Sequence, residues 1–341
     1  MSATPTPFFI VGASRSGTTM LRLLLNAHSR IGVPKELAFF TQAMQKGALT
    51  ASARGRLTAA TQRDFLHAFL TKKHHIFTRV DVAALEASIL KAHPTDLRAA
   101  LDSVMAAWLT EQGKERWGEK TPKNLFYVDY IHALYPEARF IHIVRDPRAV
   151  VYSMNRFARF LNDSVLNAFN WYLSVKDGYG LLKRAVPASL VMTIRYEDLV
   201  AGVEDTARRM CEFLGESFEP AMLDFYRESE TNIHPASAEL GGVNTLTQPI
   251  STASVDKWRG GLATSEIALV EAVCGPLMEE MGYTLTGERL AGSAHLSLQA
   301  RLAYCQVQRW RHRRMRAYQI ASMPFERSRG TVKKWVGDED E

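Results

Sequence analysis

The feature that most constrains this 341-residue chain is the stretch Phe8–Glu36, FFIVGASRSGTTMLRLLLNAHSRIGVPKE. It opens with the apolar run Phe8–Val11, which is short enough for a buried strand, and continues through the glycine-bounded loop Gly12–Thr19. Apolar residues at helical spacing follow from Met20 to Leu25. A strand, such a loop and a helix N-terminus present backbone N–H groups and a helix dipole to an anion. The stretch predicts a phosphate-binding loop; the alternative is a tight turn whose glycines serve backbone conformation alone.

The loop departs from the usual nucleotide-binding motif at one informative place. The spacing from Gly12 to Gly17 matches G-x-x-x-x-G, but Thr18-Thr19 stand where that motif has a lysine followed by serine or threonine. The positive charge lies inside the loop instead, at Arg15. No acidic residue on a neighbouring predicted strand is clearly placed to hold magnesium. These departures argue against a P-loop kinase or NTPase, which stays as an alternative function.

The run Arg15-Ser16-Gly17-Thr18-Thr19 resembles the phosphosulfate-binding loop of the sulfotransferase family. The similarity is greatest to the branch with the tyrosylprotein sulfotransferases and many bacterial relatives, and it covers about residues 8–262. It implies an enzyme that moves a sulfuryl group from PAPS (3′-phosphoadenosine 5′-phosphosulfate) to an acceptor hydroxyl on a glycan, lipid, small molecule or protein. It also implies no required metal, and a three-layer, P-loop-like α/β fold. All five residues of the run would contact the donor.

The order of predicted elements supports that fold class independently. Apolar runs at 8–11, 139–144 and 189–195 read as strands, and helical patterns separate them. Alternating strands and helices indicate βαβ units and a mainly parallel central sheet. In such sheets ligands bind at the carboxyl ends of the strands. Arg15, Arg145 and Tyr196 each follow a predicted strand, so one site can collect all three.

The remaining segments give the expected organisation. We expect a sulfotransferase domain over residues 1–290, with a helical insertion at about 39–113, and a basic C-terminal helix with an acidic tail over 291–341. Polar residues at Lys72–His75 indicate a solvated loop. The other expected segments are a loop at Trp117–Asn124, a helix from Asp163 to about Ala185, a long loop or lid at Asn232–Ser254, and helices at about Ser265–Met281 and His295–Ile320.

Three residues are the candidates for catalysis. The resemblance implies that Glu36 is the base that takes the acceptor's proton, and that Arg15 and Lys120 stabilise charge on the donor. Taken from the residues alone, Glu36 reads as a solvated carboxylate beside Lys35. Lys120 reads equally well as one half of a salt bridge with Glu119 or another acid.

The donor's 3′-phosphate has its own candidate residues. Arg145, which ends a predicted strand, and Ser153, two helical turns later, match the family's 3′-phosphate motif. Tyr196 and Lys257 match a tyrosine and a lysine near the nucleotide, although Tyr196 also reads as a core aromatic. Phe157 stands where the tyrosylprotein pattern has a further arginine, and the sequence leaves open which of its neighbours completes the site: Arg148, Arg156 or Arg159.

Composition limits where the protein is expected to reside and what it is expected to bind. With 46% hydrophobic and 23% charged residues the chain is typical of globular proteins, and no apolar run approaches the ~20 residues of a membrane span. The N-terminus lacks a basic signal region, and the three cysteines, Cys211, Cys274 and Cys305, have neither disulfide nor metal spacing. We therefore expect a cytoplasmic protein. Its net charge of +6 suits a polyanionic nucleotide, and we expect no nucleic-acid partner.

A further interpretation is non-enzymatic. The cluster Arg301–Arg316, with Trp310 within it and Tyr318 just beyond, could lie on anionic lipid, which allows a nucleotide- or membrane-binding protein. A solvated basic face or a dimer contact is the plainer interpretation of the same helix. Peripheral membrane contact is also compatible with an enzyme. No motif specifies the acceptor class or the oligomeric state.

Overall fold

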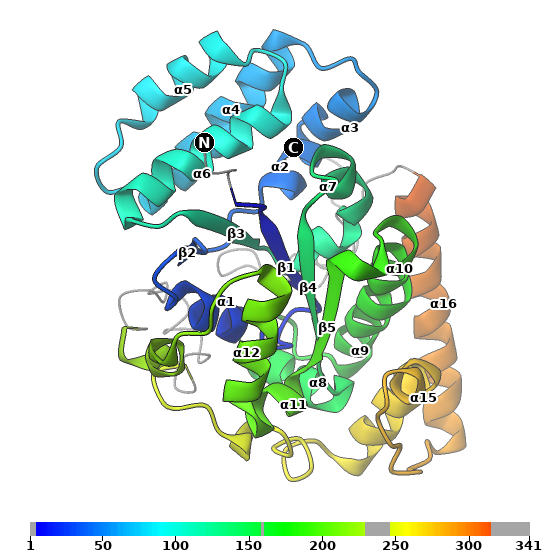
Figure 1. Cartoon of the computed structure of the whole chain (residues 1–341). Coiled ribbons are helices and arrows are strands. Elements are labelled where there is room, and N and C mark those ends of the chain that lie inside the picture. The colour runs from blue at the N-terminus through cyan, green and yellow to red at the C-terminus, as the bar shows by residue number, and fades with distance from the viewer. Residues whose placement is uncertain (1–4, 158–159, 229–245, 315–341) are drawn as a thin grey trace.

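One parallel sheet lies at the centre of the computed structural model, which describes residues 5–157, 160–228 and 246–314. The five strands run in the order β2-β3-β1-β4-β5 (Figure 1). Their bounds are Phe8–Gly12 for β1, Ile31–Gly32 for β2, Arg116–Lys120 for β3, Arg139–Val144 for β4 and Val191–Arg195 for β5. Every neighbouring pair is parallel, which confirms the predicted α/β class with a parallel sheet.

Helices cover both faces of the sheet and make three layers. Phe8 and Ile10 of β1 pack with α1 (Thr18–Asn26) and α12 (Val203–Leu214), whereas Phe9 and Val11 pack towards α2 (Phe39–Gln45), α7 (Val128–Leu134) and α10 (Gly180–Ala185). Both sides of β1 are therefore buried. This explains why the strand is a continuous apolar run rather than an alternating one.

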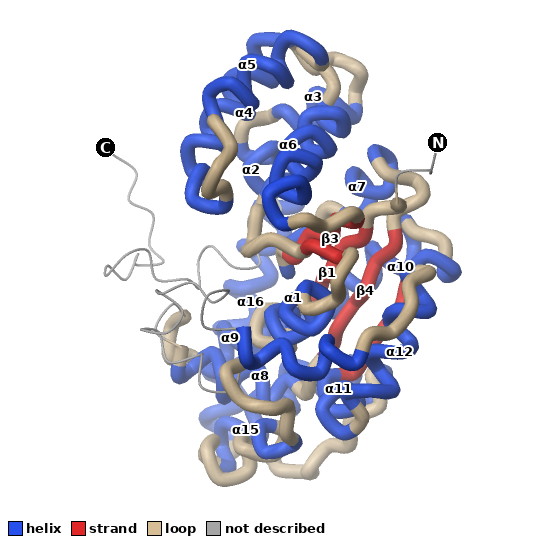
Figure 2. The backbone as a smooth tube through the Cα atoms, turned by 60° about the vertical axis from the view of Figure 1, so that its left-hand side comes forward, coloured by secondary structure: helices blue, strands red, loops and turns tan. Residues whose placement is uncertain are grey.

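Several other helices complete the fold. A third cluster packs α8 (Pro147–Arg156) against α9 (Ser164–Leu173), α15 (Thr264–Glu280) and α16 (Gly292–Arg314) (Figure 2). The remaining α-helices and their bounds are α3 Ala48–Ala53, α4 Ala59–Lys73, α5 Val82–Ala92, α6 Leu97–Gln112 and α11 Tyr196–Ala201. Short 3₁₀ segments are η1 His74–Ile76, η2 Pro122–Phe126, η4 Ala188–Leu190, η5 Pro220–Glu228 and η6 Thr252–Ser254.

The segment between β2 and β3 is helical, as predicted for residues 39–113. Helices α4, α5 and α6 gather at one end of the molecule in both views (Figures 1 and 2). Phe39, at the start of α2, stacks edge-on against Phe65 and Phe69 of α4, with ring centroids 4.9 and 5.1 Å apart. The division into an insertion, a main domain over 1–290 and a C-terminal part stays a prediction.

Strand β3 corrects the sequence analysis, which placed a loop at Trp117–Asn124. Residues 116–120 form a buried strand between β1 and β2, and only the residues after Lys120 leave the sheet. Charged residues and Gly118 hide the strand pattern, because charged side chains are rarely buried. Gly118 is required there by close approach: a Cβ on it would lie 2.2 Å from the Phe8 ring.

Two further segments differ in detail from the prediction. The expected helix from Asp163 to Ala185 is interrupted by a π-helical segment, η3 (Ser174–Tyr179), between α9 and α10. Asp163 accepts from the N–H groups of Val165 and Leu166 at the start of α9, and Asp146 caps α8. Most of the predicted loop at 232–254, and the end of the predicted C-terminal helix, lie outside the described residues.

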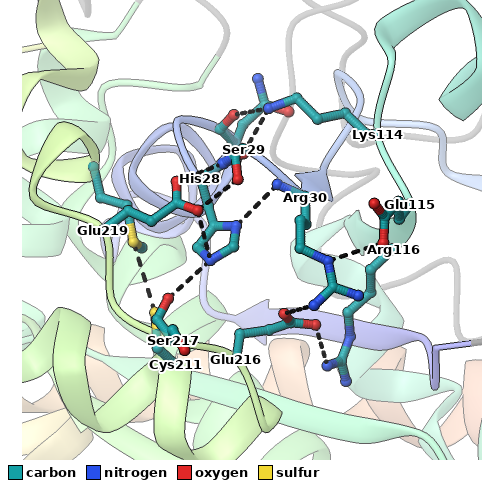
Figure 3. A network of polar contacts seen from close by, with 12 residues as sticks. His28, Ser29, Arg30, Lys114, Glu115, Arg116, Cys211, Glu216, Ser217 and Glu219 are labelled. Atoms are coloured by element: carbon teal, nitrogen blue, oxygen red, sulfur yellow. Dashed lines mark hydrogen bonds and ion pairs between the residues drawn. The ribbon is translucent and has the colours of Figure 1, made fainter.

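The amino ends of β2 and β3 are tied to the C-terminal end of α12 by a polar network (Figure 3). The Glu216 carboxylate accepts from Arg30 at 3.0 Å and from Arg116 at 3.1 Å. Arg30 also pairs with the exposed Glu115. Glu219 accepts from the backbone N–H and the hydroxyl of Ser29. These contacts lie at the end of the sheet opposite the carboxyl ends of its strands.

Candidate functional site

The glycine-bounded loop turns from β1 into α1 through two residues with left-handed backbone. Arg15 has φ 66° and Gly17, the N-cap of α1, has φ 101°. Glycine is needed at position 17 for a second reason: a Cβ would lie 2.7 Å from the ring of Tyr196. Ser16 between them is fully buried, and its hydroxyl has no hydrogen-bond partner among the described residues. Thr18 and Thr19 follow as the first residues of α1.

Arg145 is held against this loop by several contacts. Its guanidinium donates to the carbonyl oxygens of Arg15 (3.2 Å) and Ser254 (2.8 Å), and it lies 4.1 Å from the centroid of the Tyr196 ring. The Trp171 indole donates to the Arg145 carbonyl at 2.9 Å. The Nε atom of Arg145 is buried without a partner in the described part of the chain. The predicted convergence of Arg15, Arg145 and Tyr196 is therefore confirmed as geometry.

Ser153 joins the same cluster from α8. Its hydroxyl accepts a hydrogen bond of 3.0 Å from Arg15 Nε, across 138 residues of sequence. The guanidinium of Arg15 also lies 4.3 Å from the centroid of the Phe157 ring. Burial lowers the pKa of Arg15 to about 10, and the nearby charge of Arg145 contributes to the shift. Two guanidinium groups placed this close favour an anion between or beside them.

The other arginines named for the 3′-phosphate have different positions. Arg148 is buried and forms ion pairs with Asp146 (2.6 Å) and Glu271 (2.7 Å), and it lies over the Trp258 ring. Its donors are directed at these carboxylates, so it is neither a phosphate ligand in this arrangement nor a solvated residue. Arg156 is exposed and donates to Gly261 O. Arg159 lies outside the described residues.

A second cluster lies at the carboxyl end of β3, the strand next to β1. Lys120, the last residue of β3, donates to a carboxylate oxygen of Glu36 at 3.3 Å. The acid that pairs with Lys120 is therefore Glu36 itself rather than Glu119. The lysine side chain is buried, whereas that of Glu36 is partly exposed. The structure thus joins the two residues for which the sequence predicted a base and a charge-stabilising lysine.

Two residues that the sequence analysis did not assign to the site hold the segment that carries Glu36. Lys73, at the end of α4, donates to the backbone carbonyl of Glu36 at 2.5 Å. Thr121 accepts from the N–H of Ala38, whose φ is 55°. The solvated interpretation of Lys72–His75 is therefore wrong for Lys73, although Lys72, His74 and His75 are exposed. No spacing in the sequence links Lys73 to Glu36.

Glu119 and Glu197 are further missed residues. Glu119 is fully buried beneath this segment, and accepts hydrogen bonds from Thr121 and Asn124. Burial raises its pKa to about 7. Glu197 accepts from the backbone N–H of Asp146 and from the hydroxyl of Tyr283, so it fixes the turn after Arg145. Burial raises the pKa of Glu197 as well.

Lys257 is the predicted site residue that the structure does not bring into either cluster. Its side chain is exposed, while the adjacent Trp258 is buried against Arg148. Among the described residues no group of three or more His, Cys, Asp or Glu is placed to hold a metal ion. None of the described helices has both the length and the apolar character needed to span a bilayer.

An anion-binding loop and cationic side chains at the carboxyl edge of a parallel sheet define a P-loop-like α/β protein. The chain belongs to the sulfotransferase family, whose sequence profile matches residues 7–220. It is therefore a sulfotransferase, which moves a sulfuryl group to an acceptor. The match favours this activity over the nucleotide-kinase alternative and over a non-catalytic binding protein.

Individual relatives agree with this assignment. The nodulation protein NoeE of Sinorhizobium fredii is 26% identical over 306 residues, an alignment that covers 83% of this chain and 67% of that protein. The protein-tyrosine sulfotransferase 2 of Gallus gallus is 23% identical over 287 residues, covering 81% and 68%. Among solved structures, the sulfotransferase domain of the Synechococcus PCC 7002 olefin synthase has a TM-score of 0.57 and 25% identity, covering 83% of this chain and 96% of that domain.

Proposed function

We propose that the donor is PAPS and that the acceptor group is a hydroxyl. The observation that carries this proposal is the pair of unsatisfied buried atoms in the loop cluster. Ser16 Oγ and Arg145 Nε are buried polar atoms without partners among the described residues. A buried group of this kind costs free energy unless a ligand satisfies it. Both are hydrogen-bond donors, and both fit the phosphate and sulfate oxygens of a phosphosulfate nucleotide.

The residues divide between binding and transfer. Ser16, Gly17, Thr18 and Thr19 would bind the 5′-phosphate at the N-terminus of α1, where the helix dipole favours an anion. Arg145 and Ser153 would bind the 3′-phosphate, with Tyr196 beneath Arg145. The Arg15 side chain donates to Ser153, and the Arg15 backbone carbonyl accepts from Arg145. Arg15 therefore lies between the residues proposed for the 3′-phosphate and those proposed for the 5′-phosphate. Lys257 would reach the nucleotide only if its side chain left its exposed position.

The Glu36–Lys120 pair would perform the transfer. PAPS supplies a sulfuryl group and leaves as PAP, its desulfated form. Glu36 would accept the proton that the acceptor hydroxyl loses as its oxygen bonds to sulfur. Lys120 and Arg15 would stabilise the negative charge that forms on the departing phosphate oxygen. The Lys120 ammonium, 3.3 Å from Glu36, also orients the base in the resting enzyme.

We also propose that the helices of residues 39–113 contribute to acceptor binding. The support is the contact from α4 to the Glu36 segment: Lys73 comes from within these helices and reaches the backbone beside the base.

Calorimetry of PAP binding tests the donor. We expect PAP to bind without magnesium and more tightly than ATP or GTP with magnesium, and Arg145→Ala to weaken binding at least tenfold by removing a bidentate cation. Arg208→Ala, which removes an exposed arginine on α12, is the matched control and should bind PAP normally. Preference for ATP or GTP, or equal effects of the two substitutions, would refute the assignment of the donor site.

The base is tested separately with Glu36→Gln. This variant should lose sulfuryl transfer by about a thousandfold, since general-base catalysis is worth ~10²–10⁴, while PAP binding is retained. Transfer is measured with radiolabelled PAPS against a panel of hydroxyl compounds. Glu115→Gln, which removes an exposed carboxylate far from the site, should leave activity intact. Full activity in Glu36→Gln would exclude Glu36 as the base.

A further inference from the structure

The outer surface of α16 has an exposed apolar stripe. Leu296, Val307 and Trp310 are 73%, 53% and 58% exposed. These large apolar side chains therefore face water. Their spacing of 11 and 3 residues keeps them on one side of the helix, and the exposed Ala300 and Ala303 fall between them. The stripe extends over about 21 Å at the helical rise of ~1.5 Å per residue.

The opposite side of α16 is already occupied by the fold. Leu298 and Cys305 are buried, and with Leu302 they pack on the cluster that includes α9. Arg301 forms an ion pair with Asp163, and Arg309 with Asp177. The helix is therefore anchored to the protein on one side, and Figure 1 shows it at the periphery of the molecule. The side chains of the stripe are exposed on its other side.

The charge of α16 indicates what the stripe contacts. The helix sequence contains five arginines and no Asp or Glu. Two of the arginines are neutralised by Asp163 and Asp177. The other three, Arg311, Arg313 and Arg314, lie in the last turns beside Trp310 in sequence. An apolar stripe with an aromatic residue next to a cluster of arginines is the composition of helices that lie on anionic membranes.

We propose that α16 docks the enzyme on the surface of an anionic lipid bilayer. The apolar stripe enters the boundary between headgroups and acyl chains, and the positive charge of the helix's last turns attracts the anionic lipid. A second copy of this chain fits less well, because two helices that each end in Arg311, Arg313 and Arg314 and contain no acidic residue repel one another. This docking is independent of the donor site and of the identity of the acceptor.

Flotation of the full chain with vesicles tests the proposal. We expect little binding to phosphatidylcholine alone, and binding to vesicles with about 30% phosphatidylglycerol that weakens steeply with salt. Arg311→Gln, Arg313→Gln and Arg314→Gln together should weaken binding about a hundredfold, since each basic residue contributes about fivefold at an anionic surface. The matched control makes the same charge change at the exposed Arg54, Arg56 and Arg63, and should bind like the wild type.

A second variant tests the apolar contact. Val307→Ser with Trp310→Ser keeps every charge and should reduce vesicle binding about tenfold or more, without changing the affinity for PAP. Equal binding by the two arginine triples would overturn the proposal. So would a dimer in sedimentation velocity that Val307→Ser/Trp310→Ser dissociates while vesicle binding is absent, since the stripe would then join two copies.

Discussion

Glu119 places a carboxylic acid inside the protein, where Glu is almost never fully buried unless it is paired. It is fully buried in β3, with hydrogen bonds from Thr121 and Asn124. Burial raises its pKa to about 7, and the negative charge of Glu36 adds to the increase. Through Thr121, which also accepts from the Ala38 N–H, the buried acid is connected to the segment that carries Glu36. Its role is to hold Thr121 in this position.

The raised pKa of Glu119 predicts a pH dependence of stability. The group has a pKa of about 7 in the folded protein and of 4.5 in the unfolded chain. Between these values the folded state binds more protons, so the free energy of unfolding decreases as the pH rises. The contribution is fully present below pH ~4.5 and lost above pH ~7, on the order of 3 kcal/mol in total.

Glu119→Gln cannot ionise, so its melting temperature should fall less than that of the wild type from pH 5 to pH 8. Melting curves over that range measure the slope. Glu115→Gln is the control, because it replaces a carboxylate that is 62% exposed and should keep the wild-type slope. An identical slope in Glu119→Gln would show that the protonation of Glu119 does not contribute to stability between pH 5 and pH 8.

At the scale of elements, helix α4 and the residue after β3 each contact the segment that precedes α2. Lys73 holds the Glu36 carbonyl, and Thr121 holds the N–H of Ala38, a non-glycine residue with φ 55°. Left-handed backbone at such a residue costs on the order of 1 kcal/mol and persists only where neighbours enforce it. The position of Glu36 is thus fixed by residues that are 37 and 83 positions away from the groups they contact.

Lys73→Met should therefore lower the rate of transfer and spare the donor site. A displacement of the proposed base Glu36 by about 1 Å can cost ~10²-fold in rate, and we expect a tenfold to hundredfold loss in kcat with unchanged PAP affinity. Lys72→Met is the matched control, since Lys72 is the exposed neighbour on the same turn. Steady-state kinetics measure kcat for the two variants. Equal rates would mean that the contact does not position Glu36.

These elements also show what the sequence can predict. Strands β1 and β4 and the Asp146 cap were predictable, because apolar runs and capping residues are local signals. The convergence of Arg15, Arg145 and Tyr196 was predictable because parallel strands end at one edge. Strand β3 was not predictable from its sequence. Arg116 is tolerated in the core because it pairs with Glu216, which is distant in sequence, and Glu119 because it accepts from Asn124 in the following turn. The role of Lys73 depends on tertiary packing in the same way.

At the scale of the whole molecule, the two ends of the sheet have different tasks. The carboxyl ends carry the donor loop, Arg145 and the Glu36–Lys120 pair, all of which need room for ligands. The amino ends are closed by the network of Figure 3, in which Glu216 joins Arg30 and Arg116. Glu216 and Arg116 are each only 4% exposed, so this is a buried ion pair. It connects the edge strand β2 and its neighbour β3 to α12, on the face of the sheet that α1 and α12 cover.

Substitutions of Glu216 and Glu115 separate these two tasks experimentally. Glu216→Gln leaves the buried Arg116 without a countercharge and should lower the free energy of unfolding by about 3 kcal/mol, as expected when one partner of a buried pair is removed. Glu115→Gln removes the other acid paired with Arg30, but this carboxylate is exposed and the loss should stay below about 1 kcal/mol. Urea denaturation measures both. Because the network lies at the far end of the sheet, PAP affinity should be equal in the two variants under conditions where both are folded. A loss of PAP binding confined to folded Glu216→Gln would instead show that the amino ends of the sheet help to shape the donor site.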